Sequence, residues 1–208
     1  MRFLIILLGL FFALAARADI DAKINTPENR AILARVETAY NKIKTIRARF
    51  AQFNSKMKDD IQTGALYLSR PGKMRLVYDK GSPLEFYAFD GYFVYHDKEL
   101  KEASYFELSQ TPVELILKKE LKFGDPGFVV SDVREMLDEY HVTAYKKGAR
   151  ELGTLTLVVD KQALVLKQWD VLDMQGVKST VSLFDIQTNI PVDNALFVFH
   201  NPYHPKQR

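Results

Sequence analysis

The chain has 208 residues, a formal net charge of +3 and no cysteine. The absence of cysteine excludes disulfides, thiol catalysis and thiolate metal sites, so an ordinary apolar core must hold the fold together. Charges of both signs are interspersed, with only short basic pairs at Lys118-Lys119 and Lys146-Lys147. This mixture is typical of a solvated surface, and it disfavours a nucleic-acid-binding stripe.

Residues 1–18 have the pattern of a cleavable secretory signal peptide. A basic start precedes an apolar run from Phe3 to Ala15, which is too short to span a bilayer, and Ala16-Arg17-Ala18 fits the small-x-small cleavage pattern. We therefore expect the mature protein to be exported and to begin at Asp19. Its net charge is then +1, because the leader holds two of the 29 basic residues and none of the 26 acids. With no cysteine after the cleavage site, no lipid anchor is expected.

The first predicted element of the mature chain is an amphipathic helix. Thr26-Pro27-Glu28 combines an N-cap hydroxyl, a proline at the first helical position and an acid in the first turn. Apolar residues then recur at helical spacing, and the helix is predicted to end near Lys44. The members of this apolar stripe are Ile32, Leu33, Val36, Tyr40 and Ile43.

From Ile46 the apolar period changes to two, which predicts an antiparallel meander. The predicted strands run from Ile46 to a turn at Lys58-Asp59-Asp60, from Gln62 to Ser69, from Lys73 to Asp79, up to Phe89, and from Tyr92 to Asp97. Turns are expected at Arg70-Pro71-Gly72 and Asp90-Gly91.

The second half repeats this organisation after one short helix. Thr111-Pro112 precedes an apolar group and predicts a helix start, whereas Ser131 to Leu137 fits either a helical turn or the start of a strand. Further strands are predicted at Tyr140–Lys146, Thr154–Asp160, Val165–Asp173, Lys178–Gln187 and Leu196–Phe199.

The sequence predicts about ten or eleven strands and two or three helices. This number of strands is too large for a flat twisted sheet, which tends to curl beyond about ten strands. We therefore predict an α+β, mostly β fold, in which a curled antiparallel sheet forms an unclosed β-barrel (half-barrel) and the helices form a lid or plug. No internal repeat or linker interrupts the chain, so residues 19–208 are predicted to form one domain.

Chemistry-bearing motifs are absent from the sequence. The four histidines are scattered, and His200 and His204 flank a proline that prevents helical ligand spacing. No nucleophile elbow, zinc-binding helix or phosphate-binding loop occurs, and the carboxylates fall at turns or on polar strand faces. We expect no catalytic residue, no metal and no cofactor, and therefore a protein that is not an enzyme.

Ordered local patterns resemble the periplasmic lipoprotein carrier family, LolA. They begin with Ala48-Arg49-Phe50-Ala51-Gln52 and the run from Gly64 to Tyr78, and they cover nearly the whole mature chain. The remaining matches are Asp90-Gly91, Gln110 to Leu117, Val158-Val159-Asp160, Trp169 with Asp173 and Gly176, and Phe197-x-Phe199 before Pro202.

The resemblance implies a monomeric periplasmic carrier, a chaperone of a Gram-negative envelope that binds the acyl chains of outer-membrane lipoproteins in a hydrophobic cavity. It implies an inner-membrane lipoprotein-releasing ABC transporter (LolCDE-like) as donor and an outer-membrane acceptor (LolB-like). Two alternatives are a related half-barrel that carries free lipids or glycolipids, and a non-carrier envelope interaction protein with a solid core. An empty apolar cavity distinguishes the first two from the third.

The resemblance also assigns roles to particular residues. It implies that Arg70 latches the lid by donating hydrogen bonds to backbone carbonyls, although a solvated arginine held extended by Pro71 is the alternative. The residues expected to line the acyl-chain cavity are Phe50, Leu66, Leu68, Met74, Leu76 and Tyr78 from the strands, and Val113, Ile116 and Leu117 from the second helix. Their alternative is plain core beneath a helix. Trp169 is interpreted as packing.

Overall fold

The computed structural model describes residues 21, 23–124 and 127–203. The predicted signal peptide, its cleavage site and His204 lie outside these residues. Within them, two α-helices are formed, α1 (Pro27–Asn41) and α2 (Glu114–Leu117), together with three short 3-10 helices, η1 (Leu108–Gln110), η2 (Arg150–Leu152) and η3 (Asn194–Phe197). No helix of the described part of the chain is long and apolar enough to cross a membrane.

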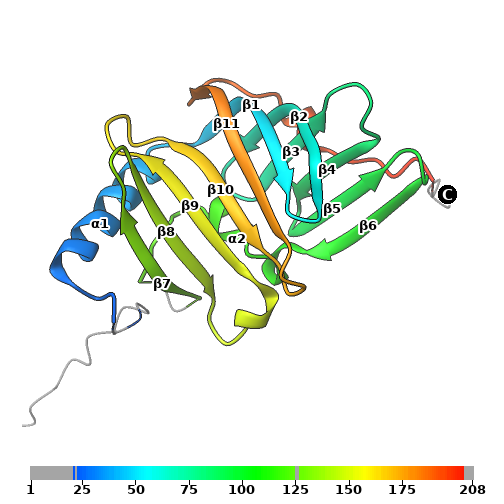
Figure 1. Cartoon of the computed structure of the whole chain (residues 1–208). Coiled ribbons are helices and arrows are strands. Elements are labelled where there is room, and N and C mark those ends of the chain that lie inside the picture. The colour runs from blue at the N-terminus through cyan, green and yellow to red at the C-terminus, as the bar shows by residue number, and fades with distance from the viewer. Residues whose placement is uncertain (1–20, 22, 125–126, 204–208) are drawn as a thin grey trace, which may run out of the picture.

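In the described part of the chain, eleven strands form a single antiparallel sheet (Figure 1). The strands are β1 (Thr45–Asn54), β2 (Met57–Ser69), β3 (Lys73–Tyr78), β4 (Leu84–Phe89), β5 (Tyr92–Asp97), β6 (Glu102–Glu107), β7 (Phe128–Glu135), β8 (Glu139–Lys146), β9 (Thr154–Asp160), β10 (Leu166–Leu172) and β11 (Lys178–Thr188). Their order is β6-β5-β4-β3-β2-β1-β11-β10-β9-β8-β7, so pairing of β1 with β11 joins two meanders.

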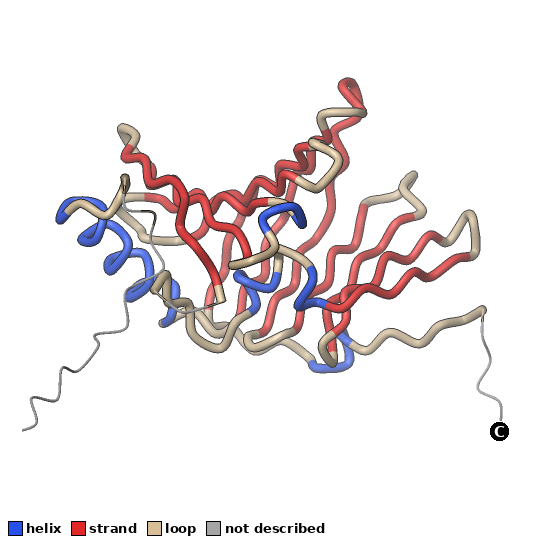
Figure 2. The backbone as a smooth tube through the Cα atoms, turned by 90° about the horizontal axis from the view of Figure 1, so that it is seen from below, coloured by secondary structure: helices blue, strands red, loops and turns tan. Residues whose placement is uncertain are grey.

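The sheet curls without closing, because β6 and β7 stand at its two edges and do not pair (Figure 2). Alternate strand residues are buried, and they form one apolar core with the buried residues of α1 and α2. We call the face that carries these helices the inner face. The predicted fold class, a mostly β half-barrel with helices over its open side, is confirmed.

The first helix begins as its sequence predicts. Thr26 is the N-cap, and its hydroxyl accepts a hydrogen bond from Asn29 N, while Pro27 opens the helix. Ile32, Leu33, Val36 and Tyr40 are buried against the inner face. Arg35 extends this contact, since its Nη1 donates to the hydroxyl of Tyr140 on β8 at 2.8 Å.

Local geometry differs from prediction in three places. The β1–β2 turn lies at Ser55-Lys56 and not at 58–60, because the side chain of Asn54 accepts from Lys56 N and closes the turn early. The final predicted strand is instead η3, where Asp193 accepts a hydrogen bond from Ala195 N. The second helix is a single turn that begins at Glu114, two residues beyond Pro112.

The structure contains one strand for which the sequence allowed two alternatives, and one strand that the sequence did not predict. The segment from Ser131 lies in β7, so its strand interpretation is the right one up to Glu135. The edge strand β6 had no predicted counterpart. Its residues are mostly exposed on both faces, so they lack the apolar alternation that marks a half-buried strand.

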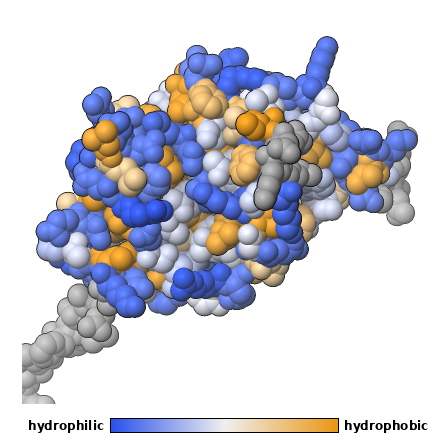
Figure 3. Space-filling model, viewed as in Figure 1, coloured by the Kyte–Doolittle hydropathy of each residue, from blue (hydrophilic) through white to orange (hydrophobic). Residues whose placement is uncertain are grey.

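The outer surface is largely polar. Figure 3 shows that hydrophilic residues occupy much of one face, with apolar side chains in separate patches. On the outer face of β8 to β11, polar side chains pair across strands, as in the contact of Thr143 with Thr156 at 2.8 Å and that of Ser182 with Gln168 at 3.0 Å. The apolar capacity of the molecule is therefore concentrated on its inner face.

Candidate functional site

An apolar cavity of about 280 Å³ lies on the inner face between the two halves of the sheet. One wall comes from β3, β4 and β5, the other from β10 and β11, and residues 111–113 before α2 cover it. We call this cavity the apolar chamber. Its lining residues are Gln52, Met74, Leu76, Tyr78, Phe86, Phe93, Thr111, Pro112, Val113, Trp169, Val171, Ser179 and Val181.

Four residues of the predicted lining are at this chamber: Met74, Leu76, Tyr78 and Val113. The other five fill the core next to it, each at most 2% exposed; these are Phe50, Leu66, Leu68, Ile116 and Leu117. The difference follows from position, since β1 and β2 lie at the centre of the sheet under the helices whereas β3 lies beside the gap.

Several lining residues were missed because they come from neighbouring strands. Phe86 on β4 pairs with Leu76, and Val181 on β11 pairs with Gln52 on β1. Trp169, interpreted from the sequence as packing, pairs with Val181 and is both buried and part of the lining. Strand pairing, which a single strand's alternation does not reveal, would have found them.

Aromatic rings form a continuous contact along one wall of the apolar chamber. Ring centres are 5.1 Å apart for Phe50 and Tyr78, 5.9 Å for Tyr78 and Phe86, and 5.6 Å for Phe86 and Phe93. The phenol of Tyr78 donates a hydrogen bond to Gln52 Oε1. Burial raises the pKa of Tyr78 well above its ordinary value, so this phenol stays protonated and remains a donor.

A second cavity of about 210 Å³ adjoins the first, because Gln52, Tyr78 and Phe86 line both. Its other lining residues are Asn54, Gln62, Leu84 and Tyr95. We call it the polar chamber, since five of its seven lining residues carry a carboxamide or a phenol, although most of the surface that lines it is apolar. The site therefore has an apolar part beneath α2 and a polar part toward the β1–β2 hairpin.

Arg70, directly after β2, joins the C-terminal end of α1 to the segment that follows α2. Nη1 donates to Tyr40 O at 2.7 Å and to Ile43 O at 2.9 Å, and Nε donates to Lys118 O at 2.8 Å. Nη2 donates to Lys119 O and to Asn41 Oδ1, each at 3.1 Å. All five donors of the guanidinium are thus used. Two of the acceptors are carbonyls at the end of α1, where helices lack intrahelical partners.

Arg70 is only 8% exposed, so its solvated alternative does not apply. Burial lowers the pKa of Arg70 from its ordinary value, with the Tyr40 phenol acting in the opposite sense. An arginine nevertheless stays charged at any physiological pH. The carbonyls therefore face a permanent, directional cation.

A second connection between the same segments was not predicted. The Asn41 carboxamide pairs with the backbone of Leu121 in both directions: Nδ2 donates to Leu121 O at 2.9 Å, and Leu121 N donates to Oδ1 at 2.7 Å. In addition, Tyr40 Oη donates to Ile116 O at 2.8 Å. An asparagine at the end of an amphipathic helix carries no sequence signal for this role.

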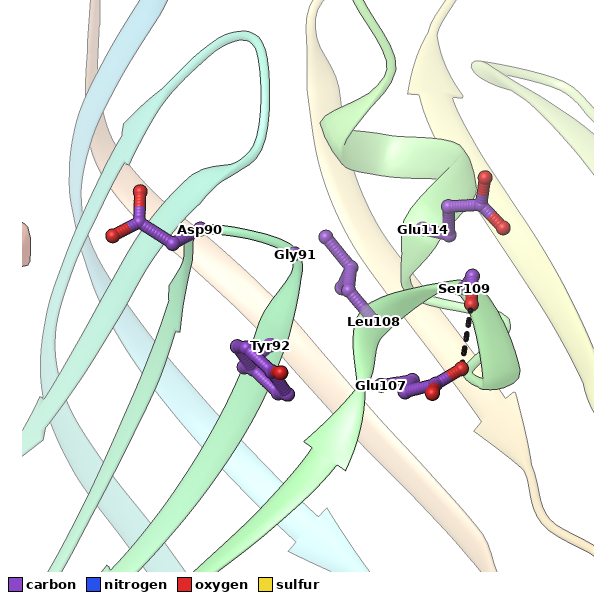
Figure 4. A pocket seen from close by; sticks show the side chains of 7 residues that line it. All are labelled: Asp90, Gly91, Tyr92, Glu107, Leu108, Ser109 and Glu114. Carbon is purple, nitrogen blue, oxygen red and sulfur yellow. Dashed lines mark hydrogen bonds between the residues drawn. The ribbon is translucent and has the colours of Figure 1, made fainter.

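A third pocket, of about 410 Å³, lies where β6 leads into η1 (Figure 4). Three carboxylates line it, those of Asp90, Glu107 and Glu114, and Glu107 accepts from Ser109 Oγ at 3.5 Å. Apolar chains gain little from such a site, because they would desolvate charged groups. The two chambers of the inner face are the better candidate for binding.

Comparison with known proteins places the chain in a family. Residues 41–200 match the family model described as outer membrane lipoprotein carrier protein LolA. The chain belongs to the LolA family. Its candidate site lies within the matched residues, from Gln52 to Val181. A search of curated proteins finds no significant match.

Solved structures that are similar to this LolA-family chain have low sequence identity to it. A DUF1329 family protein from Desulfovibrio piger has a TM-score of 0.50 at 8% identity, over 83% of this chain and 98% of that chain. A LolA superfamily protein from Nitrosomonas europaea has a TM-score of 0.46 at 7% identity, over 82% and 97%. The MucA/MucB complex of Pseudomonas aeruginosa contributes a match with a TM-score of 0.45 at 12% identity, over 83% and 61%.

Proposed function

We propose that the protein is a periplasmic carrier that binds the acyl chains of outer-membrane lipoproteins on its inner face. The observation that carries this proposal is an apolar chamber covered by a segment that Arg70 ties to α1. A LolCDE-like transporter in the inner membrane is the proposed donor, and a LolB-like protein of the outer membrane the proposed acceptor. Transfer between them needs no bond to be made or broken, in keeping with a carrier fold.

The chamber supports a carrier that opens to take its load. At about 280 Å³ it lies near the lower limit of ligand pockets, which hold roughly 300–1,000 Å³, and so takes part of one acyl chain. Full binding of a triacylated cargo requires the segment from Thr111 to Lys119 to move off the sheet. We therefore propose that Arg70 acts as the latch of the empty state.

Energetics favour such a latched design over a deep, permanent cavity. Three acyl chains hold about 45 methylenes, and at about 0.8 kcal/mol each their complete burial would release roughly 36 kcal/mol. Non-covalent affinity saturates at roughly 18 to 21 kcal/mol, so complete burial would make release too slow for transfer. Hydrogen bonds that must break when cargo enters, and reform when it leaves, reduce the net affinity.

Release from membrane vesicles tests the proposal. Vesicles carrying a lipoprotein-releasing transporter and a triacylated lipoprotein are incubated with ATP and this protein, and soluble complexes are separated by size exclusion. We expect a one-to-one complex with the acylated lipoprotein. The matched control is the same lipoprotein with its lipidated cysteine replaced by serine, which should stay unbound. Recovery of free lipid alone, without lipoprotein, would instead support the related lipid-carrying half-barrel.

A further inference from the structure

We infer that the polar chamber binds the uncharged ester and amide groups at the head of a lipid-modified polypeptide, and discriminates against the anionic head of a phospholipid. This inference rests on the proposed carrier function, and it names the part of the cargo that the protein recognises besides its acyl chains. Four observations support it: the chemistry of the lining, an unused donor, the lack of charge, and the position of the chamber in the sheet.

The lining of the polar chamber suits carbonyl groups. It contains the carboxamides of Gln52, Asn54 and Gln62 and the phenols of Tyr78 and Tyr95. Carboxamides and phenols donate and accept hydrogen bonds without carrying charge, so they match ester and amide groups, which are neutral acceptors or donors. Leu84 and Phe86 complete the lining and leave room for the first methylenes of a chain.

Gln52 lines both chambers and therefore lies at their junction. Its Oε1 accepts the phenol of Tyr78, which fixes the carboxamide, whereas its Nε2 makes no hydrogen bond to another described residue and is not a buried unpartnered atom, so it is accessible to a ligand or to water. Asn54 is positioned by its neighbours, since Nδ2 donates to Ser179 Oγ at 3.3 Å and Oδ1 accepts from Lys56 N at 2.9 Å. A carbonyl placed at the junction can therefore accept from Gln52 Nε2.

No charged side chain is among the described residues that line either chamber. A phosphodiester needs cations or several N–H donors, and burying it without them costs several kcal/mol. Two cations near β3 and β5, Arg75 and Lys98, are engaged on the outer face, where both contact Glu85. Lys178, directly before the lining residue Ser179, lies 2.8 Å from the carboxylate of Asp170. A neutral head is thus accepted, and an anionic one is excluded by desolvation.

The position of the polar chamber gives the cargo a direction. Asn54 ends β1 at the β1–β2 hairpin, whereas Arg70 follows the opposite end of β2. Gln62 and Arg70 are eight positions apart in the chain, about 26 Å of extended strand. Acyl chains in the apolar chamber then point toward the latch, and the polypeptide leaves the protein at the hairpin end, away from the segment that must move.

Binding of three probes to the full protein tests this assignment. The probes are a synthetic dipalmitoylglyceryl-cysteine peptide, dipalmitoyl phosphatidylglycerol and the uncharged fluorophore N-phenylnaphthylamine, with the two lipids measured by displacement of the fluorophore. We expect the wild type to bind the lipopeptide about tenfold more tightly than the phospholipid, the equivalent of one or two hydrogen bonds and an avoided charge burial.

Gln52→Leu should lower the affinity for the lipopeptide about tenfold. It should not lower the affinity for the fluorophore, because Gln52 also lines the apolar chamber and leucine adds apolar surface there. The matched control is Gln187→Leu, an exposed glutamine of β11 that lines neither chamber, which should change nothing. Thermal unfolding verifies that each variant folds. If Gln52→Leu does not fold, Asn54→Leu, at the far wall of the polar chamber, is measured with the same expectation.

Equal wild-type affinity for the two lipids, or a folded variant that binds the lipopeptide as tightly as the wild type, would overturn the inference while the carrier function stands. Failure of the wild type to bind any of the three probes would instead overturn the proposed function, and the inference with it. The pattern across the probes therefore separates the two failures.

Discussion

Arg70 holds Tyr40 in two ways at once: Nη1 donates to the carbonyl oxygen of Tyr40 at 2.7 Å, and the guanidinium carbon lies 4.4 Å from the centre of its ring. Tyr40 in turn donates its phenol to Ile116 O at 2.8 Å. Because Ile116 belongs to α2, the three residues connect β2, α1 and α2 in a single path. Burial raises the pKa of the Tyr40 phenol far above its ordinary value, so its donor is kept at any physiological pH.

Replacing Arg70 with leucine should loosen the segment after α2 and destabilise the fold. The substitution removes the Arg70 donor from the carbonyls of Tyr40 and Ile43, although Tyr40 O keeps its hydrogen bond from Ile43 N, and it should cost about 3 kcal/mol. Amide hydrogen exchange over residues 114–121 should become at least severalfold faster than in the wild type. Arg47→Leu, on the exposed surface of β1, is the control and should leave exchange unchanged. Unaltered exchange in Arg70→Leu would contradict the latch role.

Glu85 on β4 anchors a charged cluster on the outer face. Its carboxylate lies 2.9 Å from Lys98 Nζ and 3.4 Å from Arg75 Nη2, and it accepts from Tyr87 Oη at 2.8 Å. Burial acts to raise the pKa of Glu85. The hydrogen bonds from Lys98 and Tyr87 and the charges of Lys98 and Arg75 outweigh burial, so the pKa falls from 4.5 to about 2.

This depressed pKa predicts how stability depends on acid. A carboxyl with a lowered folded-state pKa stabilises the fold above its unfolded pKa, and the contribution is lost as pH falls from about 4.5 to about 2. Glu85→Gln should lower the free energy of unfolding at pH 7 by about 2 kcal/mol. The loss is no larger because Lys98 is half exposed, so water screens part of its attraction to Glu85. Urea titrations from pH 7 to pH 2 should show a flatter pH dependence than for the wild type. The exposed Glu102→Gln serves as control, and identical pH profiles for Glu85→Gln and wild type would refute the prediction.

Alternation of apolar residues predicted the centre of the sheet and failed at its edges. In β3, Met74, Leu76 and Tyr78 are buried in strict alternation, because one side packs on the core and the other faces outward. The edge strand β6 has no such contrast, and η3 was mistaken for a strand because Leu196 to Phe199 is apolar over too short a length to show a period.

The candidate site was partly predictable for a related reason. The alternation of apolar residues along a strand predicts which side chains point to the inner face. Whether they are covered by packed side chains or border a cavity depends on which helix lies over them. Leu66 and Leu68 share the parity of Met74, yet they fill the core while Met74 borders a cavity. The role of Arg70 was predicted from the resemblance to a family. The place of Gln52 at the chamber could not be predicted without the register of β1 with β11.

Gly64 on β2 is required because the ring of Phe50 lies over it. A Cβ added at Gly64 would lie 2.6 Å from Phe50 Cε1 and 2.2 Å from Val77 O, far inside contact distance. Gly64→Ala should therefore displace the strand or the ring and lower the free energy of unfolding by about 2 to 3 kcal/mol. In Gly127→Ala, the control, the nearest atom of the described residues that the added Cβ meets is Lys118 Nζ, at the ordinary contact distance of 3.6 Å. Denaturant titration compares the two, and equal stabilities would show that the Phe50–Gly64 contact is not restrictive.

Filling the apolar chamber from its covering segment should block binding without unfolding the protein. Val113 lines the chamber and is only partly buried, so the larger side chain of Val113→Trp can enter the cavity of about 280 Å³ in place of a ligand. We expect the affinity for N-phenylnaphthylamine to fall about tenfold, because burial of several ligand methylenes is lost at about 0.8 kcal/mol each. The melting temperature should stay close to that of the wild type, since an existing void is filled and the core is not displaced. Val198→Trp adds the same side chain at a half-exposed position outside both chambers and should bind the fluorophore as the wild type does. Undiminished binding by Val113→Trp would mean that the fluorophore binds elsewhere, and the apolar chamber would lose its place as the binding site.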